Sequence, residues 1–122
     1  MSDLSTRERL LKAAYAVFAE KGFRDTTVAE ICRRADANIA AVNYHFGDKE
    51  SLYNACWRHG FALAMEAIPL DEGVDASSSP HDRLRAFIRA FMRRVFDETE
   101  IGYFPRMMVK EMAEPTAALD AI

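Results

Sequence analysis

Residues 27–49 read TVAEICRRADANIAAVNYHFGDK, and they carry the most specific structural signals of the chain. It begins with Thr27-x-x-Glu30, the spacing of a capping box, in which each side chain accepts a hydrogen bond from a backbone N–H that the first helical turn leaves without a partner. Apolar residues then recur at three- and four-residue spacing, the period of a helix that buries one face. A helix is therefore expected over residues 27–35.

A tight turn and a second short helix follow. The turn is Asp36-Ala37-Asn38, and Asn38 is a favoured N-cap for a helix over residues 39–45, in which Val42 faces the core. Two short helices joined by a turn of about three residues predict a helix-turn-helix. Because a helix is about 10–12 Å across and the major groove of B-DNA is about 12 Å wide, an exposed second helix fits that groove.

The outward side of the second helix is suited to base edges. Ile39 and Ala40 are poor choices for a solvated surface but suit contact with a thymine methyl group, and Asn43 can hydrogen-bond N6 and N7 of adenine. Tyr44 lies toward the same side. The alternative is an ordinary short helix of a bundle, whose asparagine is simply solvated.

Longer helices are expected on both sides of this unit. The box Ser5-x-x-Glu8 starts a helix over about residues 6–21, and Gly22 provides a left-handed end. Asp48 caps a further helix that reaches about Ala67 and has Phe61 among its apolar positions.

The second half of the chain also shows helical signals. Residues 69–79 are rich in turn formers and predict a loop, and Pro80 then begins a helix with a broad apolar stripe through Phe96. A helix over about residues 103–113 stops at Glu114-Pro115, and TAALDAI at residues 116–122 is the start of another. The fold class is therefore all-α, with a helix-turn-helix domain at 1–50 and an incomplete helical domain at 61–122, joined by a helix.

Charge does not by itself indicate a nucleic-acid binder. The net charge is −3 at pH 7, and the first 50 residues carry eight basic and eight acidic side chains. DNA-binding domains usually show a basic excess, so only the placement of charges can support such a function. Arg33 and Arg34 have the sign for phosphate contacts, but they also complement the dipole at the end of their helix.

Several other classes of protein find little support. Cys32 and Cys56 lack the paired spacing of a zinc or redox site and are expected to be buried reduced thiols, so no metal or cofactor is predicted. His45, His59 and His81 lie in three different segments, and no nucleophile has a base at usable spacing, which argues against an enzyme. No signal peptide and no apolar run of about 18 residues are present, so the cytoplasm, without membrane attachment, is the expected location.

The segment TTVAEICRRADANIAAVNYHFGDKESLYNA at residues 26–55 resembles the DNA-binding signature of the TetR family of regulators, and RERLLKAAYAVFAEKGF upstream is similar to the family's first helix. The resemblance covers residues 5–60. KEMAEPTAALD at 110–120 resembles the start of the regulatory domain in one branch of the family. The chain departs from the pattern at Asp36, where the family usually has glycine; aspartate tolerates the left-handed conformation that such a turn needs.

The resemblance implies roles for individual residues. Phosphate contacts are expected from Thr27, Tyr44, His45 and Lys49, and base contacts from Ala29, Ile39, Ala40 and Asn43, with the cap Asn38 among the DNA-binding residues. Three alternatives stay open. His45 can be a satisfied, partly buried histidine, Lys49 can compensate Glu50 or Asp48, and Tyr44 can pack against the first helix.

The resemblance further implies a repressor that a small-molecule effector releases from a palindromic operator, acting as a homodimer on double-stranded DNA. A complete regulator of this kind resembles about nine helices, so we expect this chain to be part of a longer protein. Phe87, Phe91, Phe104 and Met108 are candidates for the effector pocket, or else plain helix-packing core. The alternative function is a helical interaction module of the same fold that no longer binds DNA.

Overall fold

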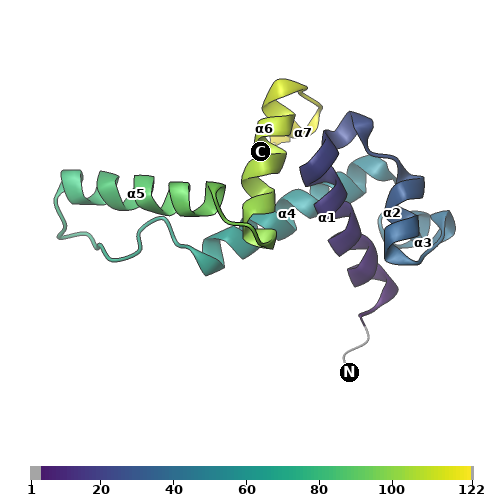
Figure 1. Ribbon diagram of the computed structural model, residues 1–122, viewed down its shortest axis with the longest axis horizontal. Coiled ribbons are helices and arrows are strands. Elements are labelled where there is room, and N and C mark those ends of the chain that lie inside the picture. Colours follow the sequence, from purple (N-terminus) through teal and green to yellow (C-terminus); the bar gives the residue numbers. More distant parts are fainter. Residues whose placement is uncertain (1–3, 122) are drawn as a thin grey trace.

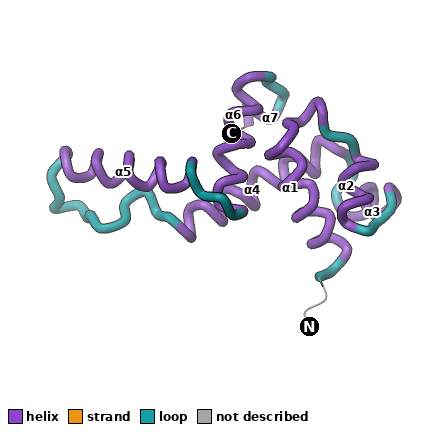
Figure 2. Tube along the Cα trace, viewed as in Figure 1, coloured by secondary structure: helices purple, strands orange, loops and turns teal. Residues whose placement is uncertain are grey.

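The computed structural model describes residues 4–121 as helices joined by turns, with no strand in that range (Figures 1 and 2). The elements are α1 (Thr6–Asp25), α2 (Val28–Ala35), α3 (Ile39–His45), α4 (Lys49–Ala67), α5 (Pro80–Val95), the 3-10 helix η1 (Glu100–Gly102), α6 (Tyr103–Ala113) and α7 (Ala118–Ala121). The all-α prediction is confirmed, and each predicted helix is present. Residues 1–3 and 122, at the ends of the two predicted domains, lie outside the described residues.

The first four helices enclose a common core. Leu10 and Phe18 of α1, Ile31 of α2, Val42 of α3 and Leu52 of α4 are all buried in it. The pattern of three- and four-residue spacing thus brings one face of each helix inward. Figure 1 shows α2 and α3 side by side at one end of the molecule, next to α1, with α4 passing behind α1.

The helix N-caps are formed largely as predicted. The hydroxyl of Ser5 accepts from the Glu8 N–H at 3.2 Å, that of Thr27 accepts from the Glu30 N–H at 3.1 Å, and the Asp48 carboxylate accepts from the Ser51 N–H at 2.7 Å. The two glutamates depart from the capping-box pattern. Glu8 accepts from the Ser5 hydroxyl, and Glu30 faces three cations instead of a backbone N–H.

The end of α1 differs from the prediction. The helix is broken at Gly22, whose φ is 81° and ψ is 175°, but a further turn continues to Asp25. The hydroxyl of Thr26 donates to the Gly22 carbonyl at 2.6 Å, so the break does not leave this carbonyl without a donor. The position of the break was thus predicted correctly from Gly22. The additional helical turn that follows it, up to Asp25 next to the buried Thr26, was not predicted.

The second half of the chain packs on α1 and α4 through α6, while α5 projects away from the other helices (Figure 1). Consequently the predicted apolar stripe of α5 has few partners, and Leu84, Phe87, Ile88, Phe91, Met92 and Phe96 are exposed. Phe61 of α4 was predicted to face inward, and this is wrong: 53% of it is exposed. Its ring meets that of Phe104 of α6 at a centroid distance of 6.0 Å.

Gly60 allows α1 and α4 to approach closely. A Cβ atom at Gly60 would lie 2.8 Å from the Tyr15 hydroxyl oxygen and 2.9 Å from its ring. That hydroxyl donates to the Glu100 carbonyl at 2.9 Å, so Tyr15 cannot move without losing a hydrogen bond between α1 and η1. The lack of a side chain at Gly60 therefore allows α4 to pack against Tyr15 while Tyr15 keeps its hydrogen bond from α1 to η1.

We expect Gly60→Ala to lower the free energy of unfolding by about 1–3 kcal/mol, the usual cost of forcing extra atoms into a packed interior. The sign is diagnostic, because alanine in an unhindered helix is favoured over glycine by about 1 kcal/mol. Chemical denaturation followed by Trp57 fluorescence measures the change. Ala62→Gly at an exposed site in the same helix gives the propensity term alone, and a more stable Gly60→Ala variant would contradict the packing argument.

Candidate nucleic-acid interface

The α3 helix presents a continuous uncharged surface to solvent. Val42 is buried, whereas Ile39 is 56% exposed, Tyr44 is 85% exposed, and Ala40 and Asn43 are exposed beside them. An isoleucine exposed at the first turn of a helix has no packing role in this chain. The helix thus buries one face and offers the other, as a helix that enters a groove must.

Exposed polar side chains cap the N-termini of both α2 and α3. Thr27 and Ala29 are exposed at the start of α2, and Asn38 is exposed at the start of α3. The Asn38 side chain accepts from the Ala41 N–H at 2.9 Å. Both Thr27 and Asn38 therefore fix backbone geometry, while the other free N–H groups and the helix dipoles favour an anion at these ends.

Tyr44 and His45 lie in the last turn of α3, and Lys49 is the first residue of α4. The rings of Tyr44 and half-buried His45 meet edge to face at 4.9 Å, and the exposure of Tyr44 excludes packing against α1. Lys49 has its ammonium 4.2 Å from the centre of the Phe23 ring and has no ion pair with Asp48 or Glu50. Burial lowers the pKa of this ammonium, and the charge of Asp25 partly opposes that shift without forming an ion pair within 4 Å.

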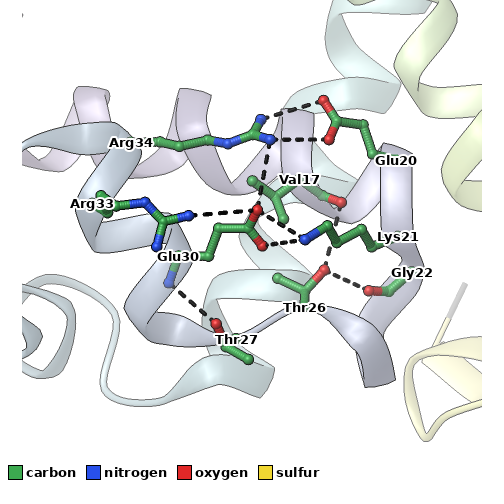
Figure 3. A network of polar contacts seen from close by, with 9 residues as sticks. All are labelled: Val17, Glu20, Lys21, Gly22, Thr26, Thr27, Glu30, Arg33 and Arg34. Carbon is green, nitrogen blue, oxygen red and sulfur yellow. Dashed lines mark hydrogen bonds and ion pairs between the residues drawn. The ribbon is translucent and has the colours of Figure 1, made fainter.

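Arg33 and Arg34 have different surroundings, as Figure 3 shows. Arg34 donates to the Glu20 carboxylate at 3.1 and 3.3 Å and lies 3.6 Å from Glu30, so it joins α2 to α1. Lys21 donates to Glu30 at 2.7 and 2.9 Å. Arg33 reaches Glu30 only at 3.9 Å and is exposed. Of these two arginines, Arg33 is the one free to meet a phosphate.

Glu30 makes this α1–α2 junction dependent on pH. The hydrogen bonds from Lys21, followed by the charges of Lys21 and Arg34, lower the pKa of the Glu30 carboxyl below its ordinary value of 4.5. A carboxyl whose pKa is lower in the folded state stabilises the fold above the unfolded pKa, and this contribution is lost as the pH falls through the folded pKa.

We therefore expect Glu30→Gln to destabilise the protein at pH 7, and we expect this loss of stability to become smaller at an acidic pH below the ordinary pKa of glutamate, as the lowered folded-state pKa is approached. Urea unfolding at the two pH values measures the difference. Glu50→Gln, in the first turn of α4 and without an ion pair among the described residues, is the matched control. An equal loss of stability at both pH values would argue against the ion pairs as its cause.

Arg9 is a positioning residue that the sequence pattern did not reveal. Its guanidinium donates to the Ala35 carbonyl at 2.9 Å and to the Asp36 carbonyl at 3.3 Å, at the end of α2. Asp36 itself has φ 53° and ψ 54°, the left-handed conformation expected there. A cation from α1 thus neutralises the free carbonyls where the chain turns toward α3.

Three of the four candidate effector-pocket residues line one cavity, and the fourth lines another hollow. A cavity of about 620 Å³ is lined by Phe91, Phe104 and Met108. Phe87 lies apart from it and lines a separate hollow between α5 and the loop before it, with Leu70 and Val74. Phe91, Phe104 and Met108 therefore line one cavity and Phe87 does not, although the Phe87 and Phe91 rings stack at a centroid distance of 6.5 Å. A role in effector binding stays a prediction for all four residues.

Comparisons with known proteins agree with this geometry. Residues 10–56 match the family described as bacterial regulatory proteins, tetR family, and residues 80–122 match the C-terminal domain of the HTH-type transcriptional dual regulator CecR. Similar proteins include the HTH-type transcriptional regulators BetI of Stenotrophomonas maltophilia (35% identical), Serratia proteamaculans (32%) and Burkholderia ambifaria (33%). Each match covers 79% of this chain and 46 or 47% of the relative.

The chain spans about half the length of these curated relatives. None of its described helices is both long and apolar enough to cross a membrane. The match over residues 10–56 takes in α2, the turn and α3, the same unit that the exposed surface of α3 singles out. The chain belongs to the tetR family of bacterial regulatory proteins.

Proposed function

We propose that this protein is a sequence-specific DNA-binding transcriptional regulator. The observation that carries the proposal is the exposed, uncharged outer face of α3, formed by Ile39, Ala40, Asn43 and Tyr44 over a buried Val42. In the proposed complex α3 lies in the major groove, where Asn43 bonds a base edge and Ile39 and Ala40 contact thymine methyl groups. Ala29 approaches the same groove from α2.

Phosphate contacts position this reading surface. The residues proposed for these contacts each lie at a helix end: Thr27 caps α2, Asn38 caps α3, Tyr44 and His45 end α3, and Lys49 begins α4. Half or more of the hydrogen bonds in protein–DNA interfaces go to the backbone of the DNA and carry no sequence information. A domain without net charge can thus hold DNA, because its dipoles and a few placed cations replace a basic excess.

We further propose that the protein acts in the cytoplasm as a homodimeric repressor, with residues 1–50 reading DNA and residues 61–122 beginning the domain that dimerises and binds a small-molecule effector. Two reading heads must lie about 34 Å apart to enter successive major grooves, so the operator is palindromic. An effector that prefers another spacing releases the DNA by its difference in affinity for the two conformations.

Selection of bound sequences from random double-stranded DNA tests the proposal. Enrichment of one palindrome, with an affinity that falls as the salt concentration rises, is the expected result. Binding of DNA without sequence preference at low salt, and no binding at physiological salt, would favour the alternative function, a helical interaction module that no longer reads DNA. The left-handed Asp36 gives that alternative no support, since the turn forms without glycine.

A further inference from the structure

The cavity of about 620 Å³ lies between α1, α4, α5 and α6 and has an apolar interior. Its walls include Phe91 and Val95 of α5 and Phe104, Met108 and Met112 of α6. The volume is within the range of about 300–1,000 Å³ that small-molecule sites occupy. Such walls suit an apolar ligand but leave its polar group unspecified.

Arg94 provides a buried cation in this wall. Only 5% of the residue is exposed, and its Nε and Nη2 atoms donate to the Ile68 carbonyl, with Nη2 also 3.5 Å from the Met65 sulfur. No carboxylate lies within 4 Å of its guanidinium in residues 4–121. Charges that are taken out of water are normally paired, because an isolated buried ion is costly.

The other charged groups of the cavity do not neutralise Arg94. Glu20 is the one carboxylate in the wall, and it is held by two hydrogen bonds from Arg34 of α2. Arg106 and Lys110 also line the cavity, and neither has an ion pair among the described residues. Arg106 donates to the Asp97 carbonyl at 3.3 Å. The cavity therefore has an excess of positive charge around an apolar interior.

We propose that this cavity binds an amphipathic anion, a carboxylate with an unbranched or aromatic hydrocarbon body, and that Arg94 holds its carboxylate. Nε and Nη2 of this guanidinium are engaged by Ile68 and Met65, whereas Nη1 has no hydrogen-bond partner in residues 4–121 and can donate to a carboxylate oxygen. A hydrogen bond between two charged groups is stronger than one between neutral groups. The body of the ligand packs against Phe91, Phe104 and Met108. Binding of this ligand does not depend on the proposed function; only its identification as the effector rests on that function.

Three probes of equal chain length test the sign of the charge on the unaltered protein: octanoate, 1-octanol and octyltrimethylammonium. Trp57 is the single tryptophan, and its ring meets Phe104 of the cavity wall at 5.3 Å, so its fluorescence reports occupancy. Octanoate is expected to bind at least about ten-fold more tightly than octanol, as for a hydrogen-bonded charge pair. Equal or tighter binding of octanol or of the ammonium compound would overturn the proposal.

Variants assign the preference to Arg94. Arg94→Met should bind octanol as before and lose the preference for octanoate, whereas Arg94→Lys should keep part of it. Arg89→Met, an exposed arginine on the same helix, is the matched control and should retain the full preference. An undiminished preference in Arg94→Met would exclude this residue. No DNA is present in this measurement, so it tests the ligand separately from DNA binding. Preference for octanoate without operator binding would contradict the proposed regulator function, and operator binding without that preference would contradict the proposed ligand.

Discussion

Replacement of Glu111 by alanine is expected to lower the free energy of unfolding by about 3–5 kcal/mol. Glu111 of α6 is 2% exposed, and its carboxylate accepts from the Tyr53 hydroxyl at 2.6 Å, from the Thr116 N–H at 2.6 Å and from the Thr116 hydroxyl at 2.9 Å. Each buried donor left without an acceptor costs about 1–3 kcal/mol, and the lost side chain also leaves a void. Denaturant unfolding monitored by Trp57 measures the loss.

A second substitution, Tyr53→Phe, distinguishes the loss of this hydrogen bond from the loss of side-chain volume. In Tyr53→Phe the donor itself is absent, so Glu111→Ala should cost less in that background than in the unaltered protein, a coupling that a double-mutant cycle gives directly. Glu111→Gln keeps the length of the side chain and one oxygen acceptor. Its free energy of unfolding should therefore lie between those of the unaltered protein and Glu111→Ala. Strict additivity of Glu111→Ala and Tyr53→Phe would mean that the hydrogen bond contributes nothing.

The position of Glu111 also explains how the two halves of the chain are joined. Tyr53 belongs to α4 near the helix-turn-helix, whereas Thr116 follows α6, so one carboxylate connects the core of the reading head to the end of the second half. The ion pair of Arg24 with Glu114, at 3.7 Å, crosses the same boundary on the surface. A motion of α6 is thus coupled to α1 and α4.

Helices, caps and turns were predictable because their signals are local. Ser5, Thr27, Asn38 and Asp48 each cap the helix that follows, since a short polar side chain reaches an N–H only two or three residues ahead. The left-handed Asp36 was predictable on the same local grounds. The face of α3 followed from Val42 alone, because a short helix with one buried side has one outward side.

Contacts between distant elements were not predictable in this way. Arg9 meets α2 across 26 residues and Glu111 meets Tyr53 across 58, and neither partner leaves a periodic signal. Phe61 shows the opposite failure, since its apolar character predicted an inward position although 53% of it is exposed. Periodicity identifies the face of a helix, but the element that packs on it depends on the rest of the fold.

Asn43→Ala and Lys49→Met are expected to change DNA binding in two different ways. Loss of a bidentate contact from Asn43 to adenine removes about 1–3 kcal/mol of discrimination at one base pair of each half-site, so the palindrome found by selection becomes degenerate at that position. Loss of the Lys49 charge weakens binding to all sequences alike. Competition between the operator and single-base variants, measured at two salt concentrations, distinguishes the two outcomes.

Methionine is the informative substitution at Lys49 because the ammonium lies over the Phe23 ring, and a long apolar side chain preserves that packing while removing the charge. The slope of log affinity against log salt concentration should fall by about one for each lysine removed. Glu50→Gln, at the neighbouring position, removes a negative charge and should not reduce this slope. A Lys49→Met variant with unchanged salt dependence would mean that Lys49 only packs on Phe23, and that the helix N-termini and Arg33 hold the phosphates instead.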